Sequence, residues 1–158
     1  MRVEYINPFV EAAFDVLSEV LQVEVKRGEL YLKSSATPVL GVAAIIGLAG
    51  DVEGRVLFDM SRPTAIKIAS GMLATMDMEP LTDLNEMGRA TITELANMIT
   101  GRAVTKLHGL GFALDLTPPA LVTGDNMEIS NSNVEALIVP MELPHGKVEV
   151  NVAIRERR

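Results

Sequence analysis

The sequence predicts an α/β protein of the α+β kind, in which a mostly antiparallel sheet packs with long helices. In three long segments, apolar residues repeat at intervals of three and four, which is typical of helices with one buried face. Other segments are short apolar runs bounded by glycine or proline, as strands are. The sequence has neither a glycine-rich strand-to-helix turn nor a regular alternation of strands and helices, so antiparallel pairing is expected.

Length and composition favour one domain that spans residues 1–158. A chain of 158 residues can bury about two-thirds of the surface that it exposes when unfolded. Hydrophobic residues make up 48% of it, but it has only four Phe, two Tyr and no Trp, so its core should be mainly aliphatic. We therefore expect core positions, rather than an adaptable binding surface, for Met72, Met76, Met78, Met87 and Met98.

The first helix is expected to begin at Asn7 and Pro8 and to run to about Gln22. Asparagine is a good helix cap, and the proline after it lacks an N–H group that the first turn would leave unpaired. The apolar face of this helix would consist of Val10, Ala13, Phe14, Leu17, Val20 and Leu21. After it, residues 23–25 and 30–32 are expected to form either a short hairpin or one bent strand.

Residues 41–48 and 55–60 are expected to form an antiparallel pair of strands. The turn between them contains two glycines, Gly50 and Gly54, which can adopt backbone angles that are closed to other residues. Ser61 can cap the helix that follows, which should end before Pro80. Pro63 would lie in its first turn, and its buried stripe would be Ile66, Ala69, Met72 and Leu73.

The longest periodic segment runs from Thr82 to about His108, where Gly109 and Gly111 should end the helix. Residues 134–141 and 148–154 then have the composition of a closing pair of strands around a turn at residues 144–146.

One face of this long helix carries a carboxylate and an amide among small residues. At 100° per residue, the apolar sector contains Ile92, Leu95, Ala96, Ile99, Ala103 and Leu110, and the opposite sector contains Ala90, Glu94, Asn97 and Gly101. Spacing alone favours an ordinary solvated face, because Glu-x-x-Asn also occurs at residues 4–7 and 128–131, both expected to lie outside helices. Gly101 argues for a function: a mid-helix glycine costs about 1 kcal/mol relative to Ala, which is easier to understand if another backbone approaches it.

Charge and residue types argue against several classes of protein. A net charge of −7, with no basic cluster except Arg155, Arg157 and Arg158, argues against nucleic acid as a partner. There are no cysteines, and His108 and His145 lack the paired spacing of a zinc helix, so no metal or cofactor of its own is expected. The longest nearly apolar run, residues 38–49, is too short to cross a bilayer, and the N-terminus lacks the apolar stretch of a secretion signal. We expect a soluble, cytoplasmic protein with no membrane partner.

Three motifs lie in these segments: Glu94-Leu-Ala-Asn97-Met-Ile-Thr-Gly101, Leu116-Thr-Pro-Pro119, and Gly50-Asp-Val-Glu-Gly54 followed by a strand and a helix at residues 65–76. With them the chain resembles, over nearly its whole length, the CheC/CheX/FliY family of chemotaxis phosphatases, and most closely its CheX branch. The family signature has Ser or Asp four residues before the Glu, and here that position is Ala90. The resemblance implies a CheC-like fold.

The resemblance also implies a phosphatase that hydrolyses the aspartyl phosphate of a CheY-like response regulator. An acyl phosphate is already reactive, so the catalyst mainly has to place a water molecule in line with the leaving oxygen. Asn97 would orient that water and Glu94 would pair with the active-site Lys of the regulator, while Ala90 and Gly101 would contact the regulator. The regulator would hold the Mg²⁺. A homodimer is implied, because close relatives pair through sheet edges.

Two alternatives remain at this point. A non-catalytic CheC-like docking module of a flagellar switch or signalling complex would use the same helix face only for binding, but such modules tend to lack the Glu and the Asn together. An unrelated small-molecule binding domain would have a concave apolar pocket, with Glu94 and Asn97 buried. One active site per chain is expected, because the nearest match on the first helix is Glu19-Val-Leu-Gln22, and Pro118 and Pro119 are expected to be structural.

Overall fold

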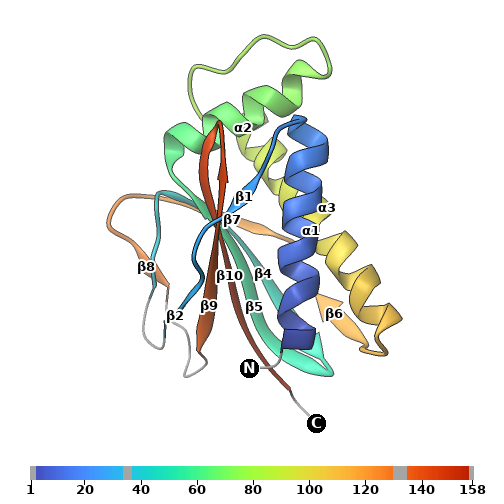
Figure 1. The fold of residues 1–158 in the computed structure, drawn as a ribbon. Helices are drawn as coiled ribbons and strands as arrows, with labels where there is room; N and C mark the ends of the chain where they lie inside the picture. The colour runs from blue at the N-terminus through green and yellow to red at the C-terminus, as the bar shows by residue number, and fades with distance from the viewer. Residues whose placement is uncertain (1–2, 34–36, 130–134, 157–158) are drawn as a thin grey trace.

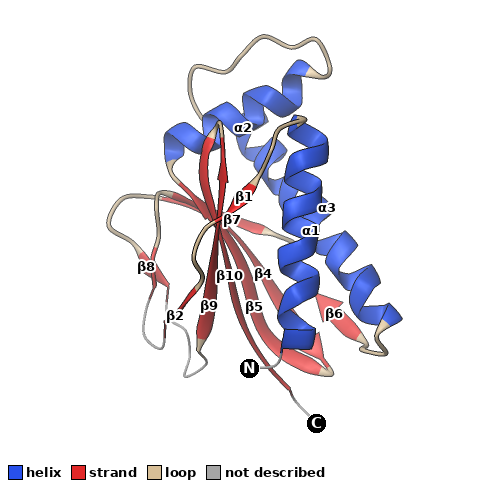
Figure 2. Ribbon diagram, in the orientation of Figure 1, coloured by secondary structure: helices blue, strands red, loops and turns tan. Residues whose placement is uncertain are grey.

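The computed structural model describes residues 3–33, 37–129 and 135–156. In this part of the chain, three helices cover one face of an antiparallel sheet, as Figure 1 and Figure 2 show. They are α1 (Val3–Leu21), α2 (Arg62–Ala74) and α3 (Glu86–Gly109). The long helices α1 and α3 pack side by side, and α2 crosses above them (Figure 1). The predicted class, an α+β fold with a mostly antiparallel sheet, is confirmed.

Four long strands form the centre of the sheet, in the order β9-β10-β5-β4. Their neighbours along the sheet are all antiparallel. The bounds are β4 Val42–Gly50, β5 Val52–Met60, β9 Ala136–Leu143 and β10 Gly146–Glu156. The predicted pairing of residues 41–48 with 55–60, and of the two closing strands, is therefore confirmed, although residue 134 lies outside the described residues.

Each edge of the sheet is one strand in two pieces. At one edge, β1 (Lys26–Arg27) and β2 (Tyr31–Lys33) both pair with β9, and at the other, β6 (Leu114–Leu116) and β7 (Ala120–Thr123) both pair with β4. The hairpin considered for residues 23–32 is wrong, because the two pieces pair with β9 and not with each other. The bent-strand alternative fits this edge in part, because its first piece is Lys26–Arg27 and not residues 23–25.

The break between β6 and β7 contains Pro118 and Pro119, which have no N–H group to donate to β4. Thr117 makes the contact in their place: its N–H donates to the Gly47 carbonyl at 3.0 Å, and its Oγ1 accepts the Gly47 N–H at 2.8 Å. The remaining described strands, β3 (Thr37–Pro38) and β8 (Glu128–Ile129), pair with each other on the side of the sheet away from the helices (Figure 1).

The main core lies between the helices and the sheet. Alternate residues of β5 and β10 face it, and Phe9 and Leu17 of α1 pack there without any exposed surface. Burying one side chain of this size contributes about 1.5–3 kcal/mol relative to leaving it in water. The largest members of this cluster, each with less than 2% exposure, are Tyr5, Phe9, Leu17, Ile46, Met60, Ile68, Ile92, Ile99 and Leu107.

The predicted start of α1 is wrong. The helix begins at Val3, and Pro8 lies inside it rather than in its first turn. The reason is tertiary: Tyr5 and Ile6 are buried, and the Tyr5 ring packs edge-on against Phe112 with 4.9 Å between the ring centroids. Burial of these two side chains holds the helical turn that precedes the proline, which local capping rules do not anticipate.

The other helices agree better with expectation. Ser61 caps α2 as predicted, its Oγ accepting the Thr64 N–H at 3.2 Å, and the helix ends at Ala74, before Pro80 as expected. The helix α3 begins at Glu86 with Asn85 as its cap, a few residues after Thr82, where the periodic segment begins. In the predicted stripe of α2, Ala69 and Leu73 are buried, whereas Ile66 and Met72 are half-buried at its margin.

Two expectations about buried residues are wrong. Leu110 is 59% exposed, because it follows the last turn of α3, and Leu107 takes its place in the core. Four of the five methionines expected in the core have large exposed fractions: Met76 64%, Met78 38%, Met87 48% and Met98 37%. The core is filled without them, mainly by aliphatic side chains and alanine, together with a few larger residues such as Tyr5, Phe9 and Met60.

Candidate functional site

The face of α3 that carries Glu94 and Asn97 is open to solvent. Both side chains are exposed, and so are Ala90, one turn before Glu94, and Gly101, one turn after Asn97. Glu94 and Asn97 lie three residues apart on the helix, which brings their Cβ atoms to about 5–6 Å of each other. Neither side chain makes a hydrogen bond or an ion pair with another residue in the described part of the chain. The four residues predicted from the sequence therefore share one exposed face.

Gly101 is not required by packing within the chain. A Cβ atom built at this position would meet no atom within 4 Å beyond its chain neighbours and the nearby helix backbone. The helix nevertheless carries the cost of a mid-helix glycine, about 1 kcal/mol relative to Ala. Contacts among the described residues do not explain that cost.

α3 is held firmly on its other sides, so its exposed face is a fixed platform. Asn85 caps its first turn, with Oδ1 accepting the Gly88 N–H at 2.9 Å. Two ion pairs link it to α1: Arg102 to Glu19 at 3.0 Å and Lys106 to Glu11 at 3.4 Å. Exposed pairs of this kind contribute little stability, but with the buried stripe of α3 they help to hold the two helices in register.

Sequence reasoning placed two further residues of this face in the core. Met87 lies seven residues before Glu94 and Met98 four residues after it, so at 100° per residue both lie within about 40° of Glu94 around the helix. The same helical projection that grouped Glu94 with Asn97 could have found them. The argument from composition, which assigned these methionines to the core, was given more weight than the helical projection.

A carboxylate and an amide on a convex, rigid helix suit chemistry on a second macromolecule. The amide can donate one hydrogen bond and accept another, which is what orienting a water molecule requires. The carboxylate can pair with a cation on the partner, and the absence of a described partner on this chain leaves it available. Neither Glu94 nor Asn97 lines any of the three pockets found among the described residues.

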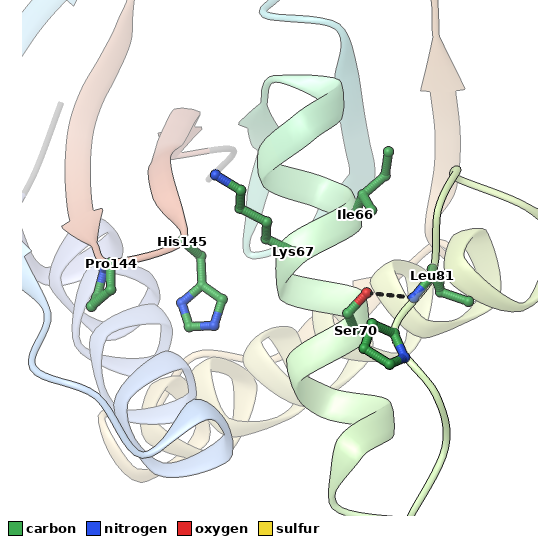
Figure 3. Close-up of a pocket in the computed structure, with 7 residues that line it drawn as sticks. Ile66, Lys67, Ser70, Leu81, Pro144 and His145 are labelled. Carbon is green, nitrogen blue, oxygen red and sulfur yellow. Dashed lines mark hydrogen bonds between the residues drawn. The ribbon is translucent and has the colours of Figure 1, made fainter.

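A pocket does exist elsewhere, between α2 and the β9–β10 turn. Figure 3 shows its lining, which is Ile66, Lys67, Ser70, Pro80, Leu81, Pro144 and His145. Its volume is about 490 Å³, and Ser70 Oγ accepts the Leu81 N–H at 2.9 Å on one wall. The pocket contains neither Glu94 nor Asn97. The small-molecule alternative required those two residues to be buried, and that requirement is not met.

His145 packs in this pocket against α2, where Gly71 leaves room for it: a Cβ atom at Gly71 would come within 3.2 Å of Nε2. Burial, and after it the charge of Lys67, lower the pKa of His145, so its imidazole is neutral near pH 7. Within the described residues, no three His, Cys, Asp or Glu side chains gather in a way that could hold a metal ion. Nor is any described helix both long and apolar enough to span a membrane.

One copy of the Glu-x-x-Asn spacing was misplaced by the sequence analysis. Glu4 and Asn7 lie inside α1, because that helix begins at Val3, and both are exposed. They border a groove of about 430 Å³ together with Pro8, Glu11, Lys106 and Leu110. The spacing on a helix is therefore not unique to α3, which makes Asn7 a useful control for Asn97.

Comparisons with known proteins agree on one family. The family model for chemotaxis phosphatase CheX matches residues 42–142. The CheY-P phosphatase CheX of Thermotoga maritima is 30% identical over 134 residues, which cover 85% of this chain and 84% of that protein.

Solved structures agree with this assignment. The CheX of Borrelia burgdorferi, in a crystal structure of a CheX–CheY–BeF₃–Mg²⁺ complex, is 47% identical with a TM-score of 0.82, covering 98% of this chain and 100% of that one. A CheC-like superfamily protein from a Shewanella species is 26% identical with a TM-score of 0.86, covering 98% and 99%. The CheC-like fold expected from the resemblance is confirmed.

Proposed function

Because this chain belongs to the CheX family of chemotaxis phosphatases, we propose that it hydrolyses the aspartyl phosphate of a CheY-like response regulator. The observation that carries the proposal is the exposed, unpartnered pair Glu94 and Asn97 on α3. A relative in the same family carries the name CheY-P phosphatase, and another has been solved together with CheY.

In the proposed mechanism, Asn97 enters the active site of the regulator and orients the attacking water. The water oxygen forms a bond to phosphorus as the bond between phosphorus and the aspartyl oxygen breaks. The aspartate leaves as a carboxylate, inorganic phosphate is released, and the proton from water goes to the phosphate or to solvent. No general base is needed, because an acyl phosphate is already reactive. The increase in rate comes from positioning the water.

Glu94 is proposed to hold the regulator in register by pairing with its active-site Lys. A carboxylate aimed at the phosphoryl group would be repelled, whereas one aimed at a cation beside it is attracted. Ala90 and Gly101 would allow the regulator to come close to α3 on both sides of the pair, since neither carries a side chain larger than a methyl group.

The regulator, not this chain, is proposed to hold the Mg²⁺ that offsets the phosphoryl charge. The Borrelia complex contains CheY with Mg²⁺ and BeF₃, a group that stands in for the phosphoryl group. The proposal takes residues 1–158 as a single domain. It also places the protein in the cytoplasm, and a sequence without cysteine is compatible with that reducing compartment.

We also propose that the protein is a homodimer that pairs through a sheet edge. The edge strand β2 and the residue before it support this, because Leu30, Tyr31 and Leu32 have exposed fractions of 59%, 39% and 59% at the edge of the sheet. Sedimentation at micromolar concentration tests the proposal, and a monomer alone would contradict it.

The proposed function is tested by mixing the protein with phosphorylated CheY-like regulator and Mg²⁺ and following the loss of aspartyl phosphate with time. The wild-type chain should accelerate the loss, and Asn97→Ala should reduce the rate by at least about 10²-fold, because positioning of the water is lost. The melting temperature should hardly change, since Asn97 is exposed.

Asn7→Ala is the matched control, because Asn7 has the same spacing to a glutamate on a different helix. This variant should keep nearly full activity. An Asn97→Ala protein that retains more than about a tenth of the wild-type rate would exclude Asn97 as the group that orients the water. A wild-type chain that binds the regulator but releases no phosphate would favour the docking-module alternative.

A further inference from the structure

The two methionines beside Glu94 belong to a continuous apolar strip along α3. Met87 is 48% exposed and Met98 is 37% exposed, although side chains of this size and polarity are usually buried. The two lie eleven residues apart, which is about 16 Å along the helix axis. Thr91 lies between them, and Thr105 continues the line, so that residues 91, 98 and 105 repeat at intervals of seven.

Both threonines use their hydroxyl groups to bind the backbone of α3. Thr91 Oγ1 donates to the Met87 carbonyl at 2.7 Å, and Thr105 Oγ1 donates to the Gly101 carbonyl at 3.1 Å. With the hydroxyl bound to the backbone one turn earlier, the methyl group of each threonine is what remains to face outward. We call Met87, Thr91, Met98 and Thr105 the methionine strip.

The strip lies between the catalytic pair and α1. On its far side, Arg102 is paired with Glu19 of α1 at 3.0 Å. On its near side are Glu94 and Gly101, which lie at almost the same angle around the helix as Met87. A partner that contacts Glu94 therefore also meets Met98, because a residue four positions away on a helix is a direct neighbour, and Met87 lies on the same side two turns before Glu94.

We propose that Met87 and Met98 are the main apolar contact between this protein and the phosphorylated regulator. The inference rests on the proposed function, and the occupant is the same regulator that Glu94 and Asn97 serve, because strip and catalytic pair form one continuous face. An exposed ion pair through Glu94 contributes little affinity by itself, whereas burial of two methionine side chains contributes substantially. The strip supplies binding, and Asn97 supplies chemistry.

The two methionines also determine which regulator surfaces can bind to the strip. Its side chain has three rotatable bonds and a polarizable sulfur, so it can fit apolar surfaces of different shape. The regulator surface that meets the strip is therefore apolar and lies next to the phosphorylation site. CheY-like regulators that differ in the shape of this surface, but keep it apolar, are accepted.

The test compares two double variants at both positions. Met87→Gln with Met98→Gln keeps the length and helix preference of each side chain but makes it polar, whereas Met87→Leu with Met98→Leu keeps it apolar. Affinity is measured by titration with regulator activated by beryllofluoride and Mg²⁺, and KM and kcat are measured in dephosphorylation. The Gln variant should raise Kd and KM at least about 10-fold, which corresponds to about 1.4 kcal/mol. Its kcat should stay within about 2-fold of the wild-type value, and the Leu variant should restore Kd to within about 3-fold.

Met76→Gln is the matched control, since it makes the same change at a methionine that is 64% exposed just after α2, outside both the methionine strip and the proposed dimer edge. It should leave Kd unchanged. Unchanged Kd and KM in the Gln double variant would overturn the inference while the proposed function, tested through Asn97, still stands. A fall in kcat at constant KM would overturn it as well. If the wild-type chain releases no phosphate, the proposed function fails, but the titration still tests whether the methionine strip binds the regulator. A wild-type chain that does not bind the activated regulator overturns both the proposed function and the proposed role of the strip.

Discussion

Glu94 is a charged side chain with no described counter-charge on its own chain. Because its charge is solvated in the free protein, a neutral residue at this position would leave the stability of the fold almost unchanged. The role proposed for Glu94 is therefore a contact that forms in a complex. The proposed contact is a lysine, and a change of charge at this single residue is therefore informative.

Glu94→Lys should weaken binding of the phosphorylated regulator at least about 10-fold, because two cations would then be brought together at the contact. The melting temperature should change little, because the residue is exposed. Isothermal titration at two salt concentrations measures the effect, which should be smaller at the higher salt.

The charge-matched control is Glu135→Lys, at an exposed position that precedes β9. This variant has the same net charge as Glu94→Lys and should bind like the wild-type protein. Equal affinities for the Glu94→Lys and wild-type proteins would remove Glu94 from the proposed interface.

At the scale of the element, α3 combines a firmly packed stripe with an exposed face that carries the proposed catalytic pair, Glu94 and Asn97. Its stability comes from the buried stripe and from its cap at Asn85, so it can carry Gly101 without unfolding. A helix of this kind can be altered on the exposed face with little effect on the fold, and the face can then be probed for close approach.

Gly101→Ala and Gly101→Leu should both stabilise the protein, by roughly 0.5–1 kcal/mol, since a new side chain meets open space and helix propensity improves. Dephosphorylation should fall little with Ala and steeply with Leu, whose side chain would hold the regulator away from Asn97 one turn earlier. Melting temperature and phosphate-release rate on the same two proteins give the answer. A stabilised Leu variant with full activity would mean that the regulator does not approach this turn.

At the scale of the whole molecule, a buried carboxyl group on β5 binds the segment of chain that leads into β4. Asp59 of β5 is 1% exposed, and both of its carboxylate oxygens lie 3.0 Å from the Leu40 N–H that they accept. Burial raises the pKa of Asp59 to about 7, with a further contribution from the charge of Glu149 on β10. Lys147 and Tyr31 face the same cluster: Lys147 lies 3.8 Å from Glu149, and the Tyr31 hydroxyl donates to it at 2.8 Å.

Asp59 should therefore make the protein less stable as the pH rises. The ordinary pKa of this carboxyl is 3.8, so between about pH 4 and pH 7 the folded protein keeps a proton that the unfolded chain has lost. Asp59→Asn removes this titration while its Oδ1 can still accept the Leu40 N–H. Relative to wild type, the variant should gain on the order of 1 kcal/mol in unfolding free energy between about pH 5 and pH 8.

Urea unfolding of both proteins across this pH range measures the difference in their unfolding free energies. Titration of His145 affects both proteins equally, so its contribution cancels in this difference. Asp51→Asn is the matched control, since Asp51 also accepts a backbone N–H, from Ala113 at 2.9 Å, but at the surface. A difference between wild type and Asp59→Asn that does not change with pH would show that Asp59 does not titrate in this way.

The sequence was sufficient for the parts of this protein that depend on local pattern. The strands β4, β5, β9 and β10, the helix α3 and the exposed positions of Glu94 and Asn97 follow from apolar spacing and from turn residues, because neighbours along a helix or strand set the face on which a side chain lies. The motifs in those elements were also enough to indicate the family, which the comparisons confirm.

Only the tertiary structure decided the features that depend on residues far apart in the chain. The first turn of α1 exists because Tyr5 meets Phe112, and the pieces of both edge strands exist because β9 and β4 offer them partners. Met87 and Met98 are exposed because other side chains already fill the core, and Asp59 holds its proton because the sheet buries it. Burial and pairing are sums over distant neighbours, and a local sequence pattern contains no information about which neighbours those will be.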